Sequence, residues 1–194
     1  MIAVRVPAAD RQQNSQVQEL GFRLIDTNLQ FLRPAGQFEL ESRRSRFSEP
    51  DDADGVESIA STELRENRFF RDPEIDTDQA KRLKGAWARN FFSGRRGDWM
   101  VVAQVQDQLA GFLQLLKGKS GVLVIDQIAV DTLFQRQGLA RDMIAYAEKH
   151  CAAESGIQVG TQLGNTASIR LYESLGFRYV SADYIYHLHL GEEK

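Results

Sequence analysis

The segment 122–140 constrains the fold more than any other part of the chain. It places an apolar strand, 122–130, and then a small-residue turn, 135–140, directly before a long amphipathic helix. Gly138 and Ala140 add no bulk on the side of the turn that faces a ligand, so backbone N–H groups can approach an anion there. The helix start adds a partial positive charge. The turn therefore predicts a phosphate or pyrophosphate site; the alternative is a helix that merely begins with glycine.

Two common nucleotide-binding motifs do not fit this turn. It lacks the Gly-Lys-Ser/Thr ending of a nucleotide-hydrolysing phosphate loop and the three-glycine spacing of a dinucleotide-binding fold. Further along, a second strand at 157–162 precedes Asn165, which opens a short helix that carries Tyr172 and ends at Leu175-Gly-Phe177. The order and spacing of these separate elements narrow the choice of fold.

The order strand, Gln-x-x-Gly-x-Ala, helix, strand, Asn-x-x-x-x-x-x-Tyr, Leu-Gly-Phe resembles the GCN5-related N-acetyltransferase (GNAT) family over roughly residues 98–189. The resemblance implies an α/β (α+β) fold with a central mixed, mostly antiparallel, twisted sheet flanked by helices. The splayed central strands of such a sheet form the coenzyme A cleft. The resemblance also implies acetyl-CoA as cofactor, with its pyrophosphate bound by the 135–140 turn.

The cofactor contacts follow from the same resemblance. The strand edge at 128–130 is expected to pair with the pantetheine arm, and a backbone N–H there to polarise the thioester carbonyl. Asn165 and Ser168 are expected to contact the cofactor and also to cap their helix. The predicted cofactor-binding residues are Ile128, Ala129, Val130, Gln135, Arg136, Gln137, Gly138, Leu139, Ala140, Arg141, Asn165 and Ser168.

Tyr172 is the predicted catalytic residue, because its spacing from Asn165 matches the position that carries the general acid in this family. A phenol near the sulfur can protonate a thiolate whose conjugate thiol has a pKa of ~8.5. The alternative is a tyrosine that packs on the sheet. The general base stays open among Asp126, His187 and a water relay.

Several segments of the N-terminal half resemble the GNAT branch that acetylates the 4-amino group of dTDP-4-amino-4,6-dideoxy sugars, typified by dTDP-fucosamine acetyltransferase. They are Leu20-Gly-Phe-Arg-Leu-Ile-Asp-Thr-Asn28, Arg68-Phe-Phe-Arg-Asp-Pro73, Trp87-x-x-Asn90 and Gly94-Arg-Arg-Gly-Asp98, together with Val159-Gly-Thr-Gln162. The resemblance implies a nucleotide-linked amino sugar as acceptor, used for polysaccharide assembly.

The residue types in these segments suit such an acceptor. Guanidinium groups can bind its pyrophosphate and aromatic rings can stack on its base. The predicted substrate-binding residues are Arg68, Arg71, Trp87, Asn90 and Arg96. The alternative is that the arginines are solvated and the aromatic rings belong to the core.

Three functions are therefore considered. The first is an acyltransferase in which the amino group of a nucleotide sugar attacks the thioester directly. The second is the same chemistry on another amine, which is a small metabolite, an antibiotic or a protein amino group. The third is a non-catalytic module that binds coenzyme A.

Length and composition set the remaining expectations. The 194 residues predict one domain. Within it, the resemblance implies acceptor-side elements at 1–97 and the acetyl-CoA core at 98–190. The net charge of −3 gives no support to nucleic acid or an anionic membrane as partner, and no apolar run is long enough to cross a bilayer. The single cysteine, Cys151, fits a cytoplasmic protein. The partner is expected to be a small-molecule amine, and the protein a monomer or homodimer.

Five local expectations complete the sequence-based prediction. The three histidines, His150, His187 and His189, have no metal-ligand spacing with acidic or thiol partners, so no metal is predicted. Residues 1–14 are expected to be a poorly ordered or loosely docked lead, and 37–42 to form a returning strand. Pro73 is expected to keep 67–73 out of helix. Gly156 is expected to end the helix that begins after the turn.

Overall fold

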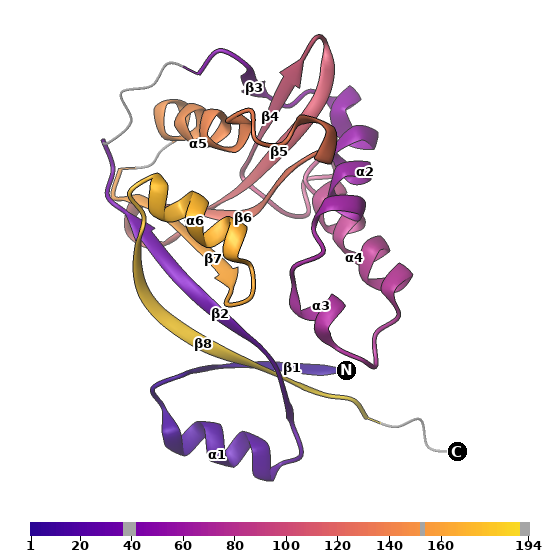
Figure 1. Cartoon of the computed structure of the whole chain (residues 1–194), viewed down its shortest axis with the longest axis vertical. Coiled ribbons are helices and arrows are strands. Elements are labelled where there is room, and N and C mark those ends of the chain that lie inside the picture. Colours follow the sequence, from indigo (N-terminus) through magenta and orange to yellow (C-terminus); the bar gives the residue numbers. More distant parts are fainter. Residues whose placement is uncertain (37–41, 152–153, 191–194) are drawn as a thin grey trace. The chain divides into compact units, whose positions relative to one another are not determined.

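A computed structural model describes residues 1–36, 42–151 and 154–190. These residues form two compact units: unit 1 comprises 1–31, 66–77 and the chain from 160 onward, and unit 2 comprises 32–65 and 78–159. The prediction of a single domain divided near residue 97 stays a prediction. The helices are α1 (Arg11–Glu19), α2 (Ala53–Glu63), α3 (Arg68–Arg71), α4 (Thr77–Arg89), α5 (Leu139–His150) and α6 (Thr166–Ser174), shown in Figure 1.

The strands are β1 (Ile2–Pro7), β2 (Arg23–Arg33), β3 (Ser45–Phe47), β4 (Trp99–Val105), β5 (Gln108–Lys117), β6 (Val122–Val130), β7 (Gly156–Gln162) and β8 (Arg178–Leu188). Short 3-10 turns are η1 (Pro50–Asp52), η2 (Lys119–Gly121) and η3 (Thr132–Phe134). Within unit 1 the strand order is β1-β8-β2-β7, and within unit 2 it is β7-β6-β5-β4-β3.

The pairing directions make the sheet mixed. Strands β3, β4, β5 and β6 pair antiparallel in turn, and β1 pairs antiparallel with β8. The ladder between β6 and β7 is parallel, and it joins Val122–Ile125 to Gly156–Val159. The described residues thus confirm the predicted fold class, a mixed and mostly antiparallel sheet flanked by helices. The coenzyme A cleft between splayed strands stays a prediction.

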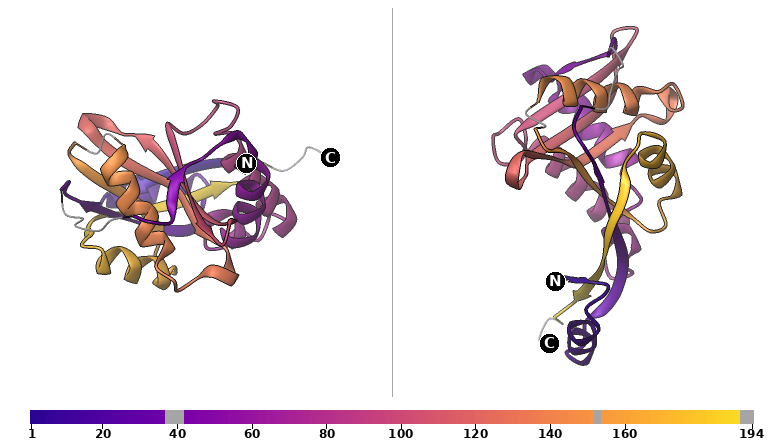
Figure 2. Two further views of the ribbon diagram at one scale, coloured as in Figure 1. Left: turned by 90° about the horizontal axis from the view of Figure 1, so that it is seen from above. Right: turned by 90° about the vertical axis from the view of Figure 1, so that its left-hand side faces the viewer.

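Opposite faces of the unit 2 sheet are covered by different helices. Phe112 and Ala129 pack into a core cluster with Val56 and Ile59 of α2 and Ala88 of α4. The neighbouring Gly111 faces the other side, because a β-carbon built on it would touch Met143 of α5. Successive side chains on a strand point to opposite faces, so α5 covers one face and α2 with α4 covers the other (Figure 2). This two-sided burial explains the apolar runs of β5 and β6.

The N-terminal segment is ordered, so the prediction of a poorly ordered lead is wrong. Strand β1 pairs with β8 from Ile2–Leu188 to Pro7–Asp183, and the helix α1 follows. Asp10 caps α1 by accepting a hydrogen bond from the N–H of Gln13 at 3.0 Å. The sequence reading failed because β1 depends on a partner strand at the far end of the chain.

Two helix boundaries also differ from the prediction. The prediction that Pro73 keeps 67–73 out of helix is wrong for Arg68–Arg71, which form the short helix α3. The proline restricts the backbone of the residue before it, Asp72, which is extended with φ −80° and ψ 114°. Helix α5 ends at His150, so Gly156 is not its cap; it opens β7 with φ 121°. Most of the predicted strand at 37–42 lies outside the described residues.

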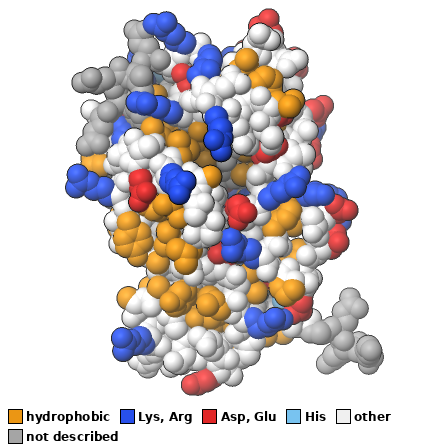
Figure 3. All heavy atoms as spheres, in the orientation of Figure 1, with side chains coloured by type: hydrophobic (Ala, Val, Ile, Leu, Met, Phe, Trp, Pro, Cys, Tyr) orange, Lys and Arg blue, Asp and Glu red, His pale blue; other side chains and the backbone are white. Residues whose placement is uncertain are grey.

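The surface carries charges of both signs. On the face that Figure 3 shows, Lys and Arg side chains are interspersed with Asp and Glu side chains. Among the described residues, no helix is both long and apolar enough to cross a membrane.

A buried ion pair stabilises the packing of α5 in unit 2. The guanidinium Nη2 of Arg33 lies 3.0 and 2.9 Å from the two carboxylate oxygens of Glu148, and Arg33 is only 1% exposed. We expect Glu148→Ala to lower the free energy of unfolding by about 3 kcal/mol, because it removes a carboxylate from a buried cation. Urea denaturation measures this change.

The exposed pair of Arg23 and Glu74 provides the control, since the Arg23 side chain is 63% exposed. Arg23→Ala is expected to cost less than about 1 kcal/mol. A loss for Glu148→Ala no larger than that for Arg23→Ala would contradict the role given to the buried pair.

Candidate functional site

The turn before α5 leaves backbone donors free at its surface. Gly138 occupies the N-cap position with φ 80°, a left-handed conformation that glycine adopts without strain, and provides no side-chain cap. Arg136 is also left-handed, with φ 60°. The first N–H groups of a helix have no acceptor within it, so those of the first α5 turn can bind an anion. The local geometry therefore suits the predicted phosphate site.

Side-chain hydrogen bonds fix the start of this turn to the end of β6. The Gln135 amide donates to the carbonyl of Val130 at 3.0 Å and to the Glu63 carboxylate at 3.3 Å. The Thr132 hydroxyl donates to the same carboxylate at 2.8 Å. Gln135, predicted to contact the cofactor, thus has an observed structural role, and its cofactor contact stays a prediction.

A brace that the sequence analysis missed joins the segment before β3 to the turn. The Asp142 carboxylate of α5 accepts hydrogen bonds from the hydroxyls of Ser42 at 2.9 Å and Ser45 at 2.7 Å, and from the N–H of Arg44 at 3.2 Å. The guanidinium of Arg44 donates to the carbonyl of Gln137 at 2.8 Å. A cation therefore stands beside the turn, contributed by a residue 93 positions away in sequence.

The other predicted cofactor residues of unit 2 differ in exposure. Leu139 is 2% exposed and Ala129 is 8% exposed, so their side chains belong to the core and only their backbone groups can serve a ligand. Arg136 and Arg141 are exposed and flank the turn. Ile128, Val130 and Ala140 are partly exposed, on the last part of β6 and the first turn of α5.

A β-bulge places an acidic residue on the face covered by α2 and α4. The pairing of β5 with β6 passes from Leu115–Ile125 to Gln114–Gln127 and skips Asp126. The Asp126 carboxylate accepts two hydrogen bonds from the guanidinium of Arg96, both at 2.6 Å. Bulges occur beside active sites, where they redirect a side chain.

An aromatic ring completes this arrangement. The guanidinium of Arg96 lies 4.4 Å from the centroid of the Trp87 ring, in cation–π contact. Two predicted substrate residues, Trp87 and Arg96, are thus together, along with Asp126, one of the candidate bases. Asn90, at the end of α4, is half-buried, and its carbonyl accepts from the N–H of Arg95 at 2.9 Å.

Two glutamines that the sequence analysis missed lie on the same ladder. Gln114 is 0% exposed and Gln127 is 4% exposed, and they face each other across β5 and β6. The Gln114 amide donates to the carbonyl of Arg96 at 3.2 Å. Its oxygen, and both polar atoms of Gln127, have no hydrogen-bond partner among the described residues. An unpaired buried polar group costs about 1–3 kcal/mol, so these amides are candidates for ligand contacts.

In unit 1, Tyr172 lies in an apolar environment. It is 2% exposed, and its ring lies 6.3 Å from the ring of Phe31 and 5.4 Å from that of Phe177, between centroids. Burial raises the pKa of Tyr172 well above the usual value of a phenol. The residue therefore stays protonated at neutral pH, as a general acid must. Asn165 caps α6 by accepting from the N–H of Ser168 at 3.1 Å, and their cofactor contacts stay predictions.

The two predicted substrate arginines of unit 1 differ in their partners. Arg71 pairs with Glu66 at 2.9 Å and with Asp26 at 3.5 Å, so its charge is already balanced. Arg68 lies over the ring of Phe69, 4.6 Å from its centroid, and burial lowers the pKa of Arg68. The Nε atom of Arg68 is buried and has no hydrogen-bond partner among the described residues. Arg68 is the better candidate for an anionic ligand.

His187 is far from Tyr172 within unit 1. Phe31 contacts both Tyr172 and Tyr179, with ring centroids 6.3 and 6.2 Å apart. Tyr179 and His187 lie on the same strand, eight residues apart, which is about 26 Å along β8. The two side chains therefore do not serve the same reacting atoms, which argues against His187 as the base if Tyr172 is the acid.

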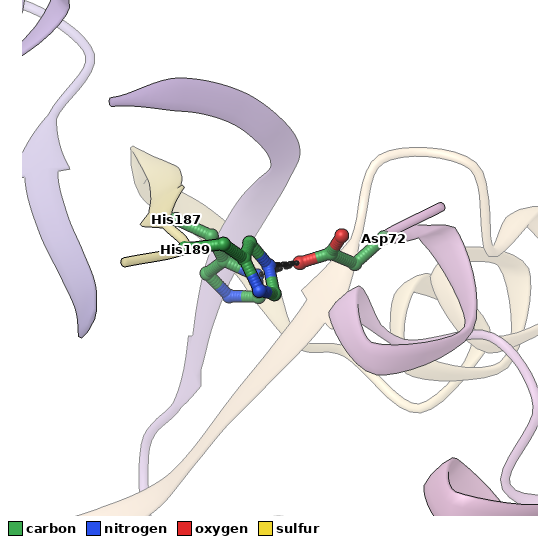
Figure 4. A group of neighbouring side chains, drawn as sticks. All are labelled: Asp72, His187 and His189. Atoms are coloured by element: carbon green, nitrogen blue, oxygen red, sulfur yellow. Dashed lines mark hydrogen bonds and ion pairs between the residues drawn. The ribbon is translucent and has the colours of Figure 1, made fainter. Parts of the chain in front are cut away.

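His187 instead belongs to a cluster with Asp72 and His189 (Figure 4). The Asp72 carboxylate lies 2.5 Å from Nδ1 of His187 and 2.8 Å from Nε2 of His189. Burial alone would raise the pKa of Asp72, but hydrogen bonds from both histidines and from the N–H of Glu74 outweigh it and lower that pKa. The sequence-based argument that no acidic residue accompanies the histidines is therefore wrong, because Asp72 is 115 positions from His187.

Comparison with known proteins points to one family. A model of the acetyltransferase (GNAT) family matches residues 58–177. Among curated proteins, the chain is similar to the spore coat polysaccharide biosynthesis protein SpsD of Bacillus subtilis (strain 168), with 30% identity over 147 residues. The match covers 75% of this chain and 50% of the relative, so the chain spans about half the length of that protein.

Solved structures share the fold at low sequence identity. A GCN5-related N-acetyltransferase from Kribbella flavida matches with a TM-score of 0.65 and 12% identity, over 98% of this chain and 69% of that one. YncA from Salmonella typhimurium, solved with its cofactor acetyl-CoA, matches with a TM-score of 0.50 and 18% identity, over 77% of this chain and 96% of that one. At these identities the likeness concerns the fold.

The Asp142 brace gives a direct test of the site geometry. We expect Asp142→Ala to lower the free energy of unfolding by about 2 kcal/mol, because it removes several hydrogen bonds to a charged group. Backbone amides of 43–46 should then exchange faster in hydrogen–deuterium exchange mass spectrometry. Asp78→Ala, which removes an exposed pair with Lys81, is the control and should leave this exchange unchanged. Equal exchange in the two variants would contradict the brace.

Proposed function

Because the chain belongs to the acetyltransferase (GNAT) family, we propose that it transfers an acetyl group from acetyl-CoA to the amino group of a nucleotide-linked sugar of the dTDP-4-amino-4,6-dideoxy type. Membership confirms the predicted family and enzyme class, and acetyl-CoA as the cofactor that this family uses. The acceptor class rests on one observation, the 30% identity to a polysaccharide biosynthesis protein. The nucleotide, the sugar and the whole protein's activity are parts of the proposal.

The turn before α5 is the proposed binding site for the cofactor's pyrophosphate. The N–H groups of the first helical turn would donate to its oxygens, and the α5 dipole would favour its negative charge. The Arg44 guanidinium, held on the Gln137 carbonyl, would add a charge-assisted hydrogen bond. Arg136 and Arg141, both exposed, are the proposed flanking cations. Asn165 and Ser168 remain proposed contacts from α6.

The chemistry requires a balanced proton transfer. Acetyl-CoA supplies a thioester: the acceptor amine forms the new C–N bond, the C–S bond breaks, and a proton from the amine ends on the sulfur. Tyr172 is the proposed donor of a proton to the sulfur, since its raised pKa keeps the phenol protonated. The proton that the amine loses then returns to the phenolate, so that the net transfer is from amine to sulfur. A backbone N–H at 128–130 is the proposed partner of the thioester carbonyl.

Water is the proposed route for the amine's proton. Both carboxylate oxygens of Asp126 accept hydrogen bonds from the Arg96 guanidinium. We therefore assign Asp126 to positioning Arg96 and not to taking up the amine's proton. The distance along β8 from Tyr179 to His187 places His187 away from Tyr172. Of the three candidate bases, these observations leave the water relay as the best supported.

The cluster on the β5–β6 ladder is the proposed acceptor contact in unit 2. Trp87 offers an aromatic ring, with the cations of Arg96 and Lys84 at 4.4 and 4.7 Å from its centroid, and Asp126 holds Arg96 in place beside it. Such a group suits a sugar ring or a base. The buried amides of Gln114 and Gln127 can read sugar hydroxyls, because each amide offers donors and an acceptor. In unit 1, Arg68 is the proposed contact to the acceptor. Arg71 is also proposed, with less support because it pairs with the carboxylate of Glu66. Asn90 remains a proposed contact.

The proposal predicts turnover and its loss in Tyr172→Phe. With acetyl-CoA and dTDP-4-amino-4,6-dideoxygalactose or its glucose epimer, free coenzyme A should be released and the sugar should gain one acetyl mass. Tyr172→Phe is expected to lower kcat about a hundredfold or more, with the affinity for acetyl-CoA unchanged. Since the raised pKa keeps Tyr172 protonated, its ionisation should cause no fall in kcat below about pH 10.

The amine panel separates the alternatives. Turnover of another amine but of neither sugar would overturn the acceptor and keep the family. If no amine is acetylated while coenzyme A still binds, a non-catalytic binding module is favoured.

Gln127→Leu tests the acceptor contact by separating stability from function. The substitution replaces a buried amide that lacks partners with an apolar side chain, so stability should stay within about 1 kcal/mol of the parent or rise. The KM for the sugar should rise about tenfold or more, because a sugar hydroxyl loses its partner. Thermal melting and steady-state kinetics measure the two effects. A clear loss of stability with an unchanged KM would show that Gln127 serves the core alone.

A further inference from the structure

We propose that Asp72, His187 and His189 form a binding site for a divalent transition-metal ion of the zinc class. The three residues belong to unit 1, and none of them has a role in the proposed acetyl transfer. One ligand atom from each residue converges, and the three atoms lie within 4.8 Å of one another. Figure 4 shows the two imidazole rings directed at the Asp72 carboxylate.

Local structure explains why the ligands converge. His187 and His189 are two residues apart at the end of β8, so their side chains point to the same face. Asp72 follows the helix α3 at its C-cap, where its N–H donates to the carbonyl of Arg68 at 3.1 Å. The Glu74 N–H donates to the other oxygen of the Asp72 carboxylate at 3.0 Å. One oxygen is thereby anchored by the backbone and the other is directed at both rings.

The ligand atoms require only small movements to accept an ion. They now lie 2.5 and 2.8 Å apart across the two carboxylate–imidazole contacts. A tetrahedral ion with bonds of about 2.0–2.1 Å separates its ligands by about 3.3 Å, so each nitrogen must move less than about 1 Å from the carboxylate oxygen. The two nitrogens, which lie within 4.8 Å of each other, must reach the same separation of about 3.3 Å. The His189 side chain, 22% exposed at the strand end, has room to do so.

Burial and neighbouring charge favour an ion here. Asp72 is 2% exposed and His187 1% exposed, while His189 gives the site an open side where water can complete the coordination. Nδ1 of His189 lies 3.8 Å from the Glu74 carboxylate, which could accept a hydrogen bond from that N–H after a small movement, as carboxylates that orient metal-bound imidazoles do. The ligand atom of His187 is Nδ1, which already faces the Asp72 carboxylate, while its Nε2 is buried on the other side of the ring.

The donor set selects the class of ion. Two imidazole nitrogens and one carboxylate oxygen suit Zn²⁺, Co²⁺, Ni²⁺ or Fe²⁺. Calcium and magnesium prefer sites made of oxygen ligands alone. The ion would tie the end of β8 to the segment after α3, so binding should stabilise unit 1.

Zinc titration of the full chain, prepared without a histidine tag and stripped with EDTA, tests the proposal. Isothermal titration calorimetry should show about one equivalent of Zn²⁺ bound with a Kd of about 10 µM or below. Because the chain has three histidines, imidazole NMR signals can be followed individually. Those of His187 and His189 should shift on adding Zn²⁺, and those of His150 should not.

Two variants provide the matched comparison. His189→Gln removes a partly exposed ligand and should weaken Zn²⁺ binding about a hundredfold while the melting temperature in EDTA changes little. His150→Gln should bind Zn²⁺ as the parent does, because His150 lies outside the cluster, with its ring 4.3 Å from that of Tyr146. If the parent binds Zn²⁺ no more tightly than His189→Gln, or if the His187 and His189 signals do not shift, the cluster is a hydrogen-bond network and the proposal fails.

Discussion

Backbone N–H groups at the start of α5 have no acceptor within the helix, and this constraint organises the part of unit 2 assigned to the cofactor. Gly138 supplies the left-handed turn that exposes them, and the apolar face of α5 holds them in place by packing on β4 and β5. Asp142, one turn into the helix, fixes the segment that carries Arg44. An anion is the natural partner for donors and a cation arranged in this way. The cofactor assigned by family membership is one that carries a pyrophosphate.

A second constraint lies on the β5–β6 ladder, where polar side chains are placed in a region that is otherwise apolar. The bulge at Asp126 lets its carboxylate meet Arg96, and the adjacent Gln114–Gln127 pair shares a face with Phe112 and Ala129. Buried amides without partners reduce stability, and a protein retains such groups where a ligand uses them. The presence of these polar side chains beside the apolar core supports the acceptor contacts that we propose in unit 2.

The sequence predicted what depends on local pattern, and it failed where distant segments meet. The apolar strand β6 and the glycine turn before α5 come from local pattern and turn chemistry, and they were predicted correctly. Strand β1 was missed because its pairing partner, β8, is at the other end of the chain. Arg44 and Asp72 were missed for the same reason, since each reaches its partner across about a hundred residues. Gln127 gave no signal, because its burial depends on the ladder and on the helices above it.

The most direct test of the cofactor assignment is amide NMR of the full chain during titration with coenzyme A. The account predicts that the amide signals of 136–141 shift first and saturate with the binding isotherm, and that Asp142→Ala weakens these shifts by releasing Arg44. Coenzyme A that binds while the signals of 136–141 stay unchanged would contradict the account, because the free N–H groups at the start of α5 would then have no part in holding the cofactor.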